Sequence, residues 1–326
     1  MPGTFQKWNV LKGSQIQSFD VVADPFQNIS VRSIRLTMSV LGALPLSLRI
    51  LLGRILGSLF SLLPTRDRTV AALQMNYFLP ECGARKHLGK MYAGLGQSVF
   101  ECLNLTPYIQ HLERYISCND EALLEEYLNS KQGILVLSAH TGNWDLLAAY
   151  LIKKGLRLTV IGREARQPIL QQLLSTIREG YGVETIWRSD TAAAFKIMKK
   201  LRRGEVVASL LDQDTDVPSR FIPFFGTPAR TPSSIVEMAK RVQARIMPLF
   251  IFRTGFCRYH VRLHEIKNTL EVEEILTEFN RLLEQHIREF PSQWVWVHKR
   301  WRSVPDGRKL SSREYIAYLI ELKQRG

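Results

Sequence analysis

The sequence is poor in the patterns that mark a disulfide framework, a metal site or a serine hydrolase. Its 326 residues include four cysteines, none in a CxxC pair, and seven histidines, none in an HExxH motif. We therefore expect free thiols in a reducing compartment and no bound metal. No GxSxG nucleophile elbow occurs. The first ten residues lack the apolar run of a signal peptide, so we expect no cleaved leader.

Long hydrophobic runs are absent as well. Near the N-terminus the longest stretch without a charged residue is 36–48, which is 13 residues, whereas a helix that spans a bilayer needs about 20. Within 46–63, leucine and isoleucine recur at helical spacing, and small residues fall on the opposite side. This pattern predicts an amphipathic, membrane-associated helical segment over 34–63, with a helix packed on the protein core as the alternative. Residues 1–33 are weakly patterned and are expected to form an N-terminal extension.

Positive charge is abundant. The chain has 44 lysines and arginines against 30 acidic residues, a formal net charge of +14. Such a surface favours anionic partners, which include nucleic acid, anionic lipids and acidic carrier proteins, without choosing among them. Residues 299–326 carry eight basic and three acidic side chains. We expect a basic C-terminal helix or tail over 306–326.

From about residue 130 onward, short apolar runs alternate with amphipathic helical patterns. The apolar runs predict buried strands, and the intervening segments predict helices. This alternation indicates an α/β fold, a single domain with a central mixed, mostly parallel sheet flanked by helices. The expected strands are 133–140, 158–162, 183–187, 205–211, 246–252 and 259–265, with a further extended piece at 294–298.

One strand end carries the residues with catalytic chemistry. His140 follows the apolar run that begins at Gly133, Asn143 is a good helix N-cap, and Asp145 falls in the first turn of the next helix. Ligands bind beyond the strand ends of such sheets. We expect the Asp145 carboxylate to bond the His140 ring and orient it as a general base. Without a serine or cysteine nucleophile, this pair suits direct acyl transfer to a hydroxyl, whereas a histidine that only caps the helix is the alternative.

The segment HTGNWD at 140–145 resembles the His-x4-Asp/Glu motif of the glycerolipid acyltransferases, and is most similar to the lipid A biosynthesis acyltransferases. Four further fragments resemble that family in the correct order: NYFLPE at 76–81, LRRGEVV at 201–207 leading to LDQD at 211–214, IPFFG at 222–226, and QWVWVHKRWR at 293–302. The resemblance covers roughly 40–303. It departs from the family at Asp145, where glutamate is usual, and in the segment after Arg163.

This resemblance implies an acyltransferase domain over 64–305. It implies that His140 is the base and Asp145 its partner, and that no cofactor is needed. It implies transfer of a fatty acyl group from an acyl carrier protein thioester to a hydroxyl of a lipid A precursor. The expected partners are therefore acyl carrier protein, an anionic glycolipid and the cytoplasmic face of a bacterial inner membrane, and no nucleic acid. The residues expected to bind substrate are Asn143, Arg163, Arg178 and Asp212.

Two alternatives stay open. The first keeps the chemistry and changes the substrates to another glycolipid or a lysophospholipid, with acyl-CoA or acyl carrier protein as donor; the aspartate at 145 favours it. The second is a non-enzymatic basic module that binds nucleic acid or membranes. It explains the charge but not the ordered segment from strand through His140 to helix.

Overall fold

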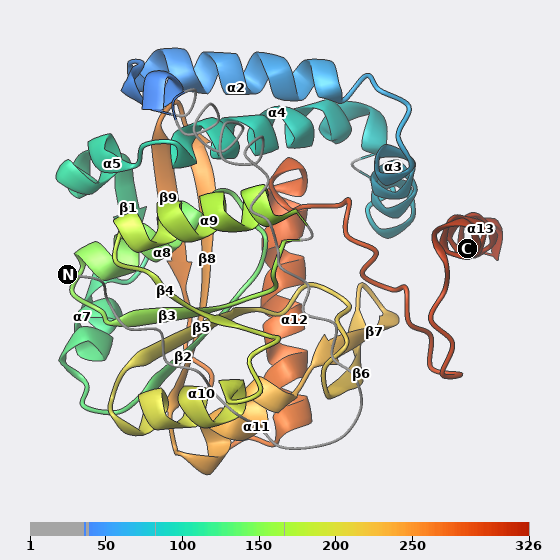
Figure 1. The fold of residues 1–326 in the computed structure, drawn as a ribbon. Coiled ribbons are helices and arrows are strands. Elements are labelled where there is room, and N and C mark those ends of the chain that lie inside the picture. The colour runs from blue at the N-terminus through green and yellow to red at the C-terminus, as the bar shows by residue number, and fades with distance from the viewer. Residues whose placement is uncertain (1–35, 37–38, 82, 166, 326) are drawn as a thin grey trace, which may run out of the picture.

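A seven-stranded sheet with the order β1-β9-β8-β2-β5-β3-β4 forms the centre of the protein (Figure 1). This computed structural model describes residues 36, 39–81, 83–165 and 167–325, so the expected extension over 1–33 lies outside the described part. All strand pairs in the sheet are parallel except β8 with β9, which confirms the expected mixed, mostly parallel α/β architecture. The strands are β1 (Ile116–Cys118), β2 (Ile134–Ser138), β3 (Leu158–Gly162), β4 (Glu184–Trp187), β5 (Val206–Leu210), β8 (Arg245–Gly255) and β9 (Arg258–Leu263).

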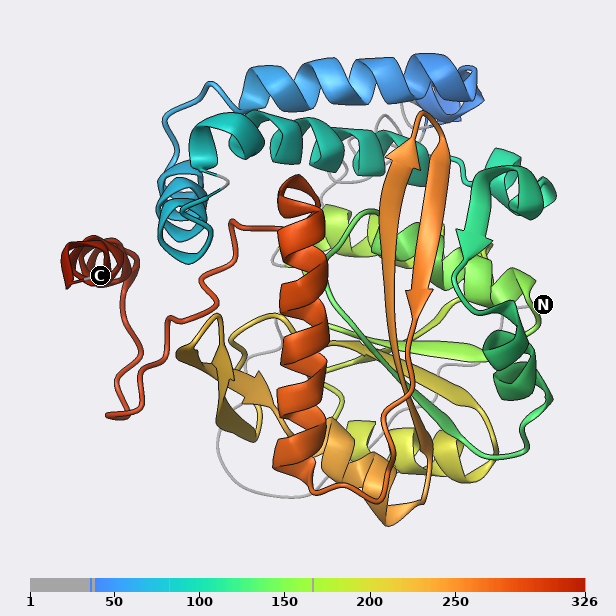
Figure 2. The same cartoon turned by 180° about the vertical axis from the view of Figure 1, so that it is seen from behind.

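Helices cover both faces of this sheet because its central strands are apolar on both sides. All five residues of β2 are buried. Ile134 and Val136 enter one apolar core, whereas Leu135 and Leu137 enter another, as the alternation along a strand requires. The first face carries α7 (Glu121–Asn129), α8 (Trp144–Lys153) and α9 (Pro168–Gly180); the opposite face, seen in Figure 2, carries α10 (Ala193–Arg202), α11 (Ser234–Arg241) and α12 (Val272–Glu289).

Two long helices form an outer layer at one end of the sheet. α2 (Leu46–Phe60) lies along α4 (Ala84–Cys102) (Figure 1), and the two helices touch through glycines. A Cβ atom on Gly53 would lie 2.5 Å from the Gly96 carbonyl oxygen, and one on Gly57 would lie 2.2 Å from the Tyr92 carbonyl oxygen. Only glycine permits such contact between backbones.

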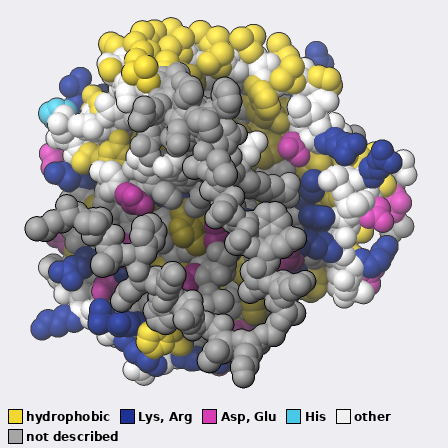
Figure 3. Space-filling model, in the orientation of Figure 1, with side chains coloured by type: hydrophobic (Ala, Val, Ile, Leu, Met, Phe, Trp, Pro, Cys, Tyr) yellow, Lys and Arg dark blue, Asp and Glu magenta, His cyan; other side chains and the backbone are white. Residues whose placement is uncertain are grey.

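The glycine side of α2 packs inward, so its leucine-rich side faces outward. The exposed large apolar residues of this helix are Leu48, Leu51, Ile55, Leu56, Leu59 and Phe60. Figure 3 shows hydrophobic side chains covering this edge of the molecule. The expected amphipathic helix is thus present over Leu46–Phe60. Its apolar side faces outward, whereas a surface helix of a water-soluble protein turns its apolar side toward the core. None of the described helices has the length and apolar character needed to cross a bilayer.

The remaining elements surround this core. A separate antiparallel hairpin, β6 (Ser219–Phe224) with β7 (Thr227–Pro232), was not expected, because its prolines weaken a strand pattern. The expected extended piece at 294–298 forms only an isolated bridge between Trp294 and Thr141. The C-terminal helix α13 packs on α3 through Tyr315, whose hydroxyl donates to Gln74 Oε1 at 2.6 Å. The other helices are α3 (Arg66–Phe78), α5 (Thr106–Gln110), α6 (Leu112–Tyr115), the 3-10 turn at Pro291–Gln293 and α13 (Ser312–Arg325).

Candidate active site

The register of two neighbouring strands brings His140 and Asp212 together. In the parallel pair β2 and β5, Ser138 is the partner of Leu210. His140 and Asp212 each lie two residues beyond this pair, so both chains leave the sheet side by side. Asp212 Oδ1 lies 2.8 Å from His140 Nδ1, and Asp212 Oδ2 accepts the backbone N–H of His140 at 2.9 Å.

Asp212 is held rigidly and away from solvent. Its residue is 0% exposed, and Trp294 Nε1 donates a further hydrogen bond to Oδ2 at 2.8 Å. Burial alone would raise the pKa of this carboxyl, but the charge of His140 and the hydrogen bonds that it donates hold the pKa below its usual value. Asp212 is therefore an anion that accepts the proton on His140 Nδ1, which leaves Nε2 as the basic nitrogen.

Asp145 does not form the expected hydrogen bond with the His140 ring. Its Oδ1 accepts a hydrogen bond from Arg178 Nε at 3.1 Å, and both side chains are about one-fifth exposed. Asp145 is the second residue of α8, as expected, but the adjacent strand end already supplies His140 with Asp212. The expected pairing is thus replaced by a pairing across the sheet, and a catalytic role for Asp145 stays a prediction.

Asn143 and Asp212, two of the residues expected to bind substrate, are buried and hydrogen-bonded within the protein. Asn143 is 1% exposed and caps α8, as expected, because its Oδ1 accepts the Leu146 N–H at 3.1 Å. Its Nδ2 donates to Glu101 Oε2 at 2.9 Å. Both polar atoms of the Asn143 side chain are therefore occupied. Asp212 is buried behind His140, so neither residue offers free polar atoms to a ligand.

A cavity of about 610 Å³ opens beside His140, between the sheet and helices α8 and α9. Arg163 and Arg178, which the family resemblance implied as substrate-binding residues, line it, and their binding of substrate stays a prediction. Its polar residues, which lie at the strand ends and on the facing helices, include His140, Trp144, Asp145, Arg163, Arg178, Arg188, Gln213 and His298. Its apolar residues come from strands and helices together and include Val136, Leu147, Ala148, Leu151, Leu158, Val160, Leu174 and Ala208. The cavity thus joins a charged end to an apolar interior of the kind that accepts a hydrocarbon chain.

Gln213 and His298 complete the surroundings of the base. Gln213 Nε2 lies 3.3 Å from His140 Nε2 and 2.9 Å from His298 Nε2. Burial, together with the neighbouring His140, lowers the pKa of His298 to about 3, so His298 is neutral near pH 7. The sequence assigned no role to either residue, although both lie within matched fragments, LDQD and QWVWVHKRWR.

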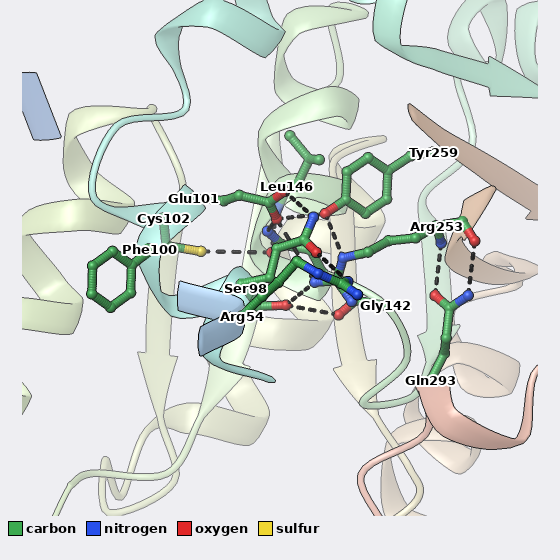
Figure 4. A network of polar contacts seen from close by, with 12 residues as sticks. Arg54, Ser98, Phe100, Glu101, Cys102, Gly142, Leu146, Arg253, Tyr259 and Gln293 are labelled. Carbon is green, nitrogen blue, oxygen red and sulfur yellow. Dashed lines mark hydrogen bonds and ion pairs between the residues drawn. The ribbon is translucent and has the colours of Figure 1, made fainter. Parts of the chain in front are cut away.

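The turn between His140 and α8 is clamped from several sides (Figure 4). The Ser98 hydroxyl donates to the Gly142 carbonyl at 2.9 Å, and the Gly142 N–H donates to the Gln293 carbonyl at 2.9 Å. Gly142 has φ +53°, and a Cβ there would lie 2.2 Å from the Ile251 carbonyl oxygen. Only glycine fits this position. Because the Gly142 N–H is already bonded to the Gln293 carbonyl, it is not free to stabilise an oxyanion.

Glu101 fixes the same turn from α4 (Figure 4). It is 0% exposed, and its carboxylate accepts hydrogen bonds from four side chains. The donors are Gln97 Nε2 at 2.8 Å, Tyr108 Oη at 2.7 Å, Asn143 Nδ2 at 2.9 Å and Tyr259 Oη. Arg253 lies 3.7 Å from the carboxylate and balances its charge. A buried anion is tolerated here because its hydrogen bonds and its counter-ion replace water.

These features define a class of site, a histidine held by a buried carboxylate at the mouth of a partly apolar cavity. No serine or cysteine among the described residues is hydrogen-bonded to the His140 ring, whose side-chain hydrogen-bond partners are Asp212 and Gln213. The chain belongs to the bacterial lipid A biosynthesis acyltransferase family, whose sequence model matches residues 33–303.

Curated relatives are similar to this chain at low identity. A lipid A biosynthesis acyltransferase of Haemophilus influenzae is 24% identical over 75% of this chain and 79% of its own length. The lipid A biosynthesis myristoyltransferase of Escherichia coli is 24% identical over 57% of this chain and 58% of its own length. A phosphatidylinositol mannoside acyltransferase of Mycobacterium tuberculosis is 22% identical over 61% of this chain and 63% of its own length.

Proposed function

We propose that this protein transfers a fatty acyl group from an acyl carrier protein thioester to a hydroxyl of a lipid A precursor. The observation that carries the proposal is the His140–Asp212 pair at the charged end of an apolar cavity. The cavity takes the acyl chain and places its thioester carbonyl near His140 Nε2. The names of the relatives from Haemophilus and Escherichia support lipid A as the acceptor.

In this reaction His140 first takes a proton from the acceptor and later gives it to the leaving group. Its Nε2 takes the proton of the acceptor hydroxyl while that oxygen attacks the thioester carbonyl. Asp212 stabilises the resulting imidazolium through Nδ1–H. The tetrahedral intermediate then collapses, the C–S bond breaks, and the imidazolium returns its proton to the leaving thiolate. The products are an ester and the free thiol of the carrier, and no acyl-enzyme forms.

Gln213 is the side chain best placed to stabilise the oxyanion. Its amide nitrogen lies 3.3 Å from His140 Nε2, so an acceptor hydroxyl bound at Nε2 would displace it towards the carbonyl oxygen. The neutral His298 ring holds this amide from the other side, at 2.9 Å. An oriented N–H donor in a site shielded from water lowers the barrier because the charge develops only in the transition state.

Two arginines at the cavity suit an acidic substrate group. Burial lowers the pKa of Arg188, and the like charge of Arg163 lowers it further. A phosphate between these guanidinium groups would relieve their repulsion and accept paired hydrogen bonds. Arg178 is already paired with Asp145, so Arg163 and Arg188 are the ones we assign to a phosphate of the acceptor or of the carrier's prosthetic group.

The outer layer suits work at a membrane surface. The exposed leucine side of α2 is the type of surface that inserts among lipid headgroups, and the net charge of +14 favours an anionic bilayer and an acidic carrier. We therefore place the protein on the cytoplasmic face of the bacterial inner membrane, with the apolar side of α2 in the interface.

The central test is transfer by the purified full chain, with radiolabelled acyl carrier protein thioesters and a lipid A precursor in mixed micelles. We expect the wild type to add one acyl chain, detected by mass spectrometry, and His140→Ala to lose about 10²- to 10⁴-fold in rate. His111→Ala, a change at an exposed histidine, is the matched control and should keep full activity. Full activity of His140→Ala would overturn the mechanism, and absence of any transfer by the wild type would overturn the activity.

The similarity to a mycobacterial phosphatidylinositol mannoside acyltransferase supports a second acceptor class, another glycolipid. The two are separated by one panel, in which lipid A precursor, phosphatidylinositol mannoside and a lysophospholipid are each offered with acyl carrier protein and CoA donors. A preference of at least tenfold in kcat/KM for the mannoside would replace the first proposal by the second.

A further inference from the structure

A second hollow, of about 400 Å³, lies where three segments meet: the start of α2, helix α6 and the tip of the β8–β9 hairpin. None of its lining residues lines the catalytic cavity. The hairpin tip reaches the level of the outer helix layer, as both views of the fold show (Figures 1 and 2). The hollow therefore opens at the end of the molecule that exposes the apolar side of α2.

Two arginines give this hollow an unbalanced positive charge. Arg114 and Arg258 both line it, and both are exposed. Neither makes an ion pair within the described part of the chain, whereas surface arginines such as Arg281 do. Arg114 lies over the Tyr115 ring, 5.4 Å from its centroid, which leaves its N–H groups available to an anion. Glu113, the acid next to Arg114 in the sequence, does not line the hollow.

The apolar surroundings distinguish this hollow from an ordinary basic surface. Phe256, at the hairpin tip, is 64% exposed and forms one wall. Leu48 and Leu51 continue the apolar surface along α2 from the opposite wall. Cations next to an exposed aromatic ring and a leucine stripe match the layered chemistry of a bilayer, in which phosphate lies directly above hydrocarbon.

We propose that this hollow binds the phosphate of an anionic phospholipid, with Arg114 and Arg258 on the phosphate and the acyl chains along α2 and Phe256. The occupant is a lipid of the surrounding bilayer rather than a reactant, because the hollow is separate from the catalytic cavity. The proposal extends the membrane-facing role of α2 proposed above and does not depend on acyl transfer, so a binding assay without turnover tests it.

The test compares binding of the full chain to vesicles of phosphatidylcholine alone and of phosphatidylcholine with 30% phosphatidylglycerol, at about 0.15 M salt. We expect Arg114→Gln/Arg258→Gln to bind the phosphatidylglycerol vesicles about 30-fold more weakly than wild type, at the usual contribution of a basic side chain near an anionic surface. Arg114→Lys/Arg258→Lys should keep most of the binding. The matched control is Arg241→Gln/Arg313→Gln, which removes two exposed arginines from α11 and α13, away from the hairpin tip.

A second measurement locates the hairpin tip. Phe256→Trp adds a fluorophore whose emission, taken as the difference from wild type, should be quenched by brominated phosphatidylglycerol in the vesicles. Excess inorganic phosphate at matched ionic strength should not release the protein, since a free anion lacks the acyl chains.

Three outcomes would overturn the proposal. In the first, the control variant Arg241→Gln/Arg313→Gln binds the phosphatidylglycerol vesicles as weakly as Arg114→Gln/Arg258→Gln does. In the second, the tryptophan of Phe256→Trp is not quenched by brominated phosphatidylglycerol. In the third, Arg114→Gln/Arg258→Gln binds vesicles as the wild type does but has a raised KM for acyl carrier protein. The last result would assign the arginines to the carrier instead. If the wild type transfers no acyl group but the vesicle experiments give the expected results, only the proposed function is refuted.

Discussion

Replacement of Asp212 by asparagine tests whether Asp212 or Asp145 is the carboxylate that orients His140. Asp212 accepts three hydrogen bonds, from the His140 backbone N–H, His140 Nδ1 and Trp294 Nε1. Asparagine of the same shape has one oxygen and an NH2 group, so at least one of these donors loses its acceptor. It also removes the negative charge that stabilises the imidazolium. Together these losses predict a fall of about 10²- to 10⁴-fold in kcat, the scale seen when the carboxylate partner of a histidine base is neutralised.

Asp145→Asn is the comparison that makes this prediction sharp. Asparagine at 145 keeps an oxygen for Arg178, and the pair is partly exposed, so we expect less than a tenfold change in kcat. The assay is steady-state thiol release from acyl carrier protein thioester, with KM and kcat measured separately for each variant. Thermal melting accompanies it, because Asp212 is buried.

Two results would refute the reasoning. One is a folded Asp212→Asn variant with wild-type kcat, and the other is an Asp145→Asn variant that loses as much kcat as Asp212→Asn. The second result would mean that substrate binding moves Asp145 onto the His140 ring, in agreement with the pairing that the sequence suggested.

Three further predictions concern the cavity, the clamp and stability. Ala208→Leu places three carbons in the apolar interior and should shift the preferred acyl chain, measured by donor competition, about two to four carbons shorter. Glu101→Gln should lower kcat more than it raises KM. Asn143→Asp added to this variant should restore part of kcat, because the new glutamine amide at 101 can donate a hydrogen bond to the new carboxylate at 143. Burial lowers the pKa of His286 to about 3, so between about pH 6.5 and 3 only the unfolded state binds this proton. The free energy of unfolding should therefore fall by about 1.5–2 kcal/mol for this histidine between pH 6.5 and 5. Urea titrations at several pH values measure this fall, and His286→Phe should make it smaller.

Local patterns predicted the strands of the sheet well, because a strand that is buried on both faces appears in the sequence as a short continuous apolar run. The run at 158–162 coincides with β3, and Asn143 caps α8 as its residue type indicated. The prediction for α2 was correct in its helical spacing, but the sequence left open which side would face the protein. Close contact of Gly53 with Gly96 resolves this, and such contact depends on a partner helix more than 30 residues away in the sequence.

The catalytic pairing was harder to predict because it depends on strand order. His140 and Asp145 are five residues apart, which made them the obvious pair. Asp212 reaches His140 only because β5 lies beside β2 in register, although β3 and β4 lie between them in the sequence. Gln213 follows the same strand end, and His298 arrives on a segment without regular structure. Spacing along one turn therefore could not rank Asp212 above Asp145.

The buried hydrogen bonds around Glu101 connect this sheet-edge chemistry to the outer helices. Arg54 of α2 donates to Gln97 Oε1 at 3.2 Å, Gln97 donates to Glu101, and Asn143 of the catalytic turn donates to the same carboxylate. A slide of α4 against the sheet would break at least one of these bonds and leave a buried charge short of donors, which is costly. The His140 turn therefore keeps a fixed position relative to the exposed side of α2. If that side rests in a bilayer, the same bonds set the depth at which the base meets its lipid substrate.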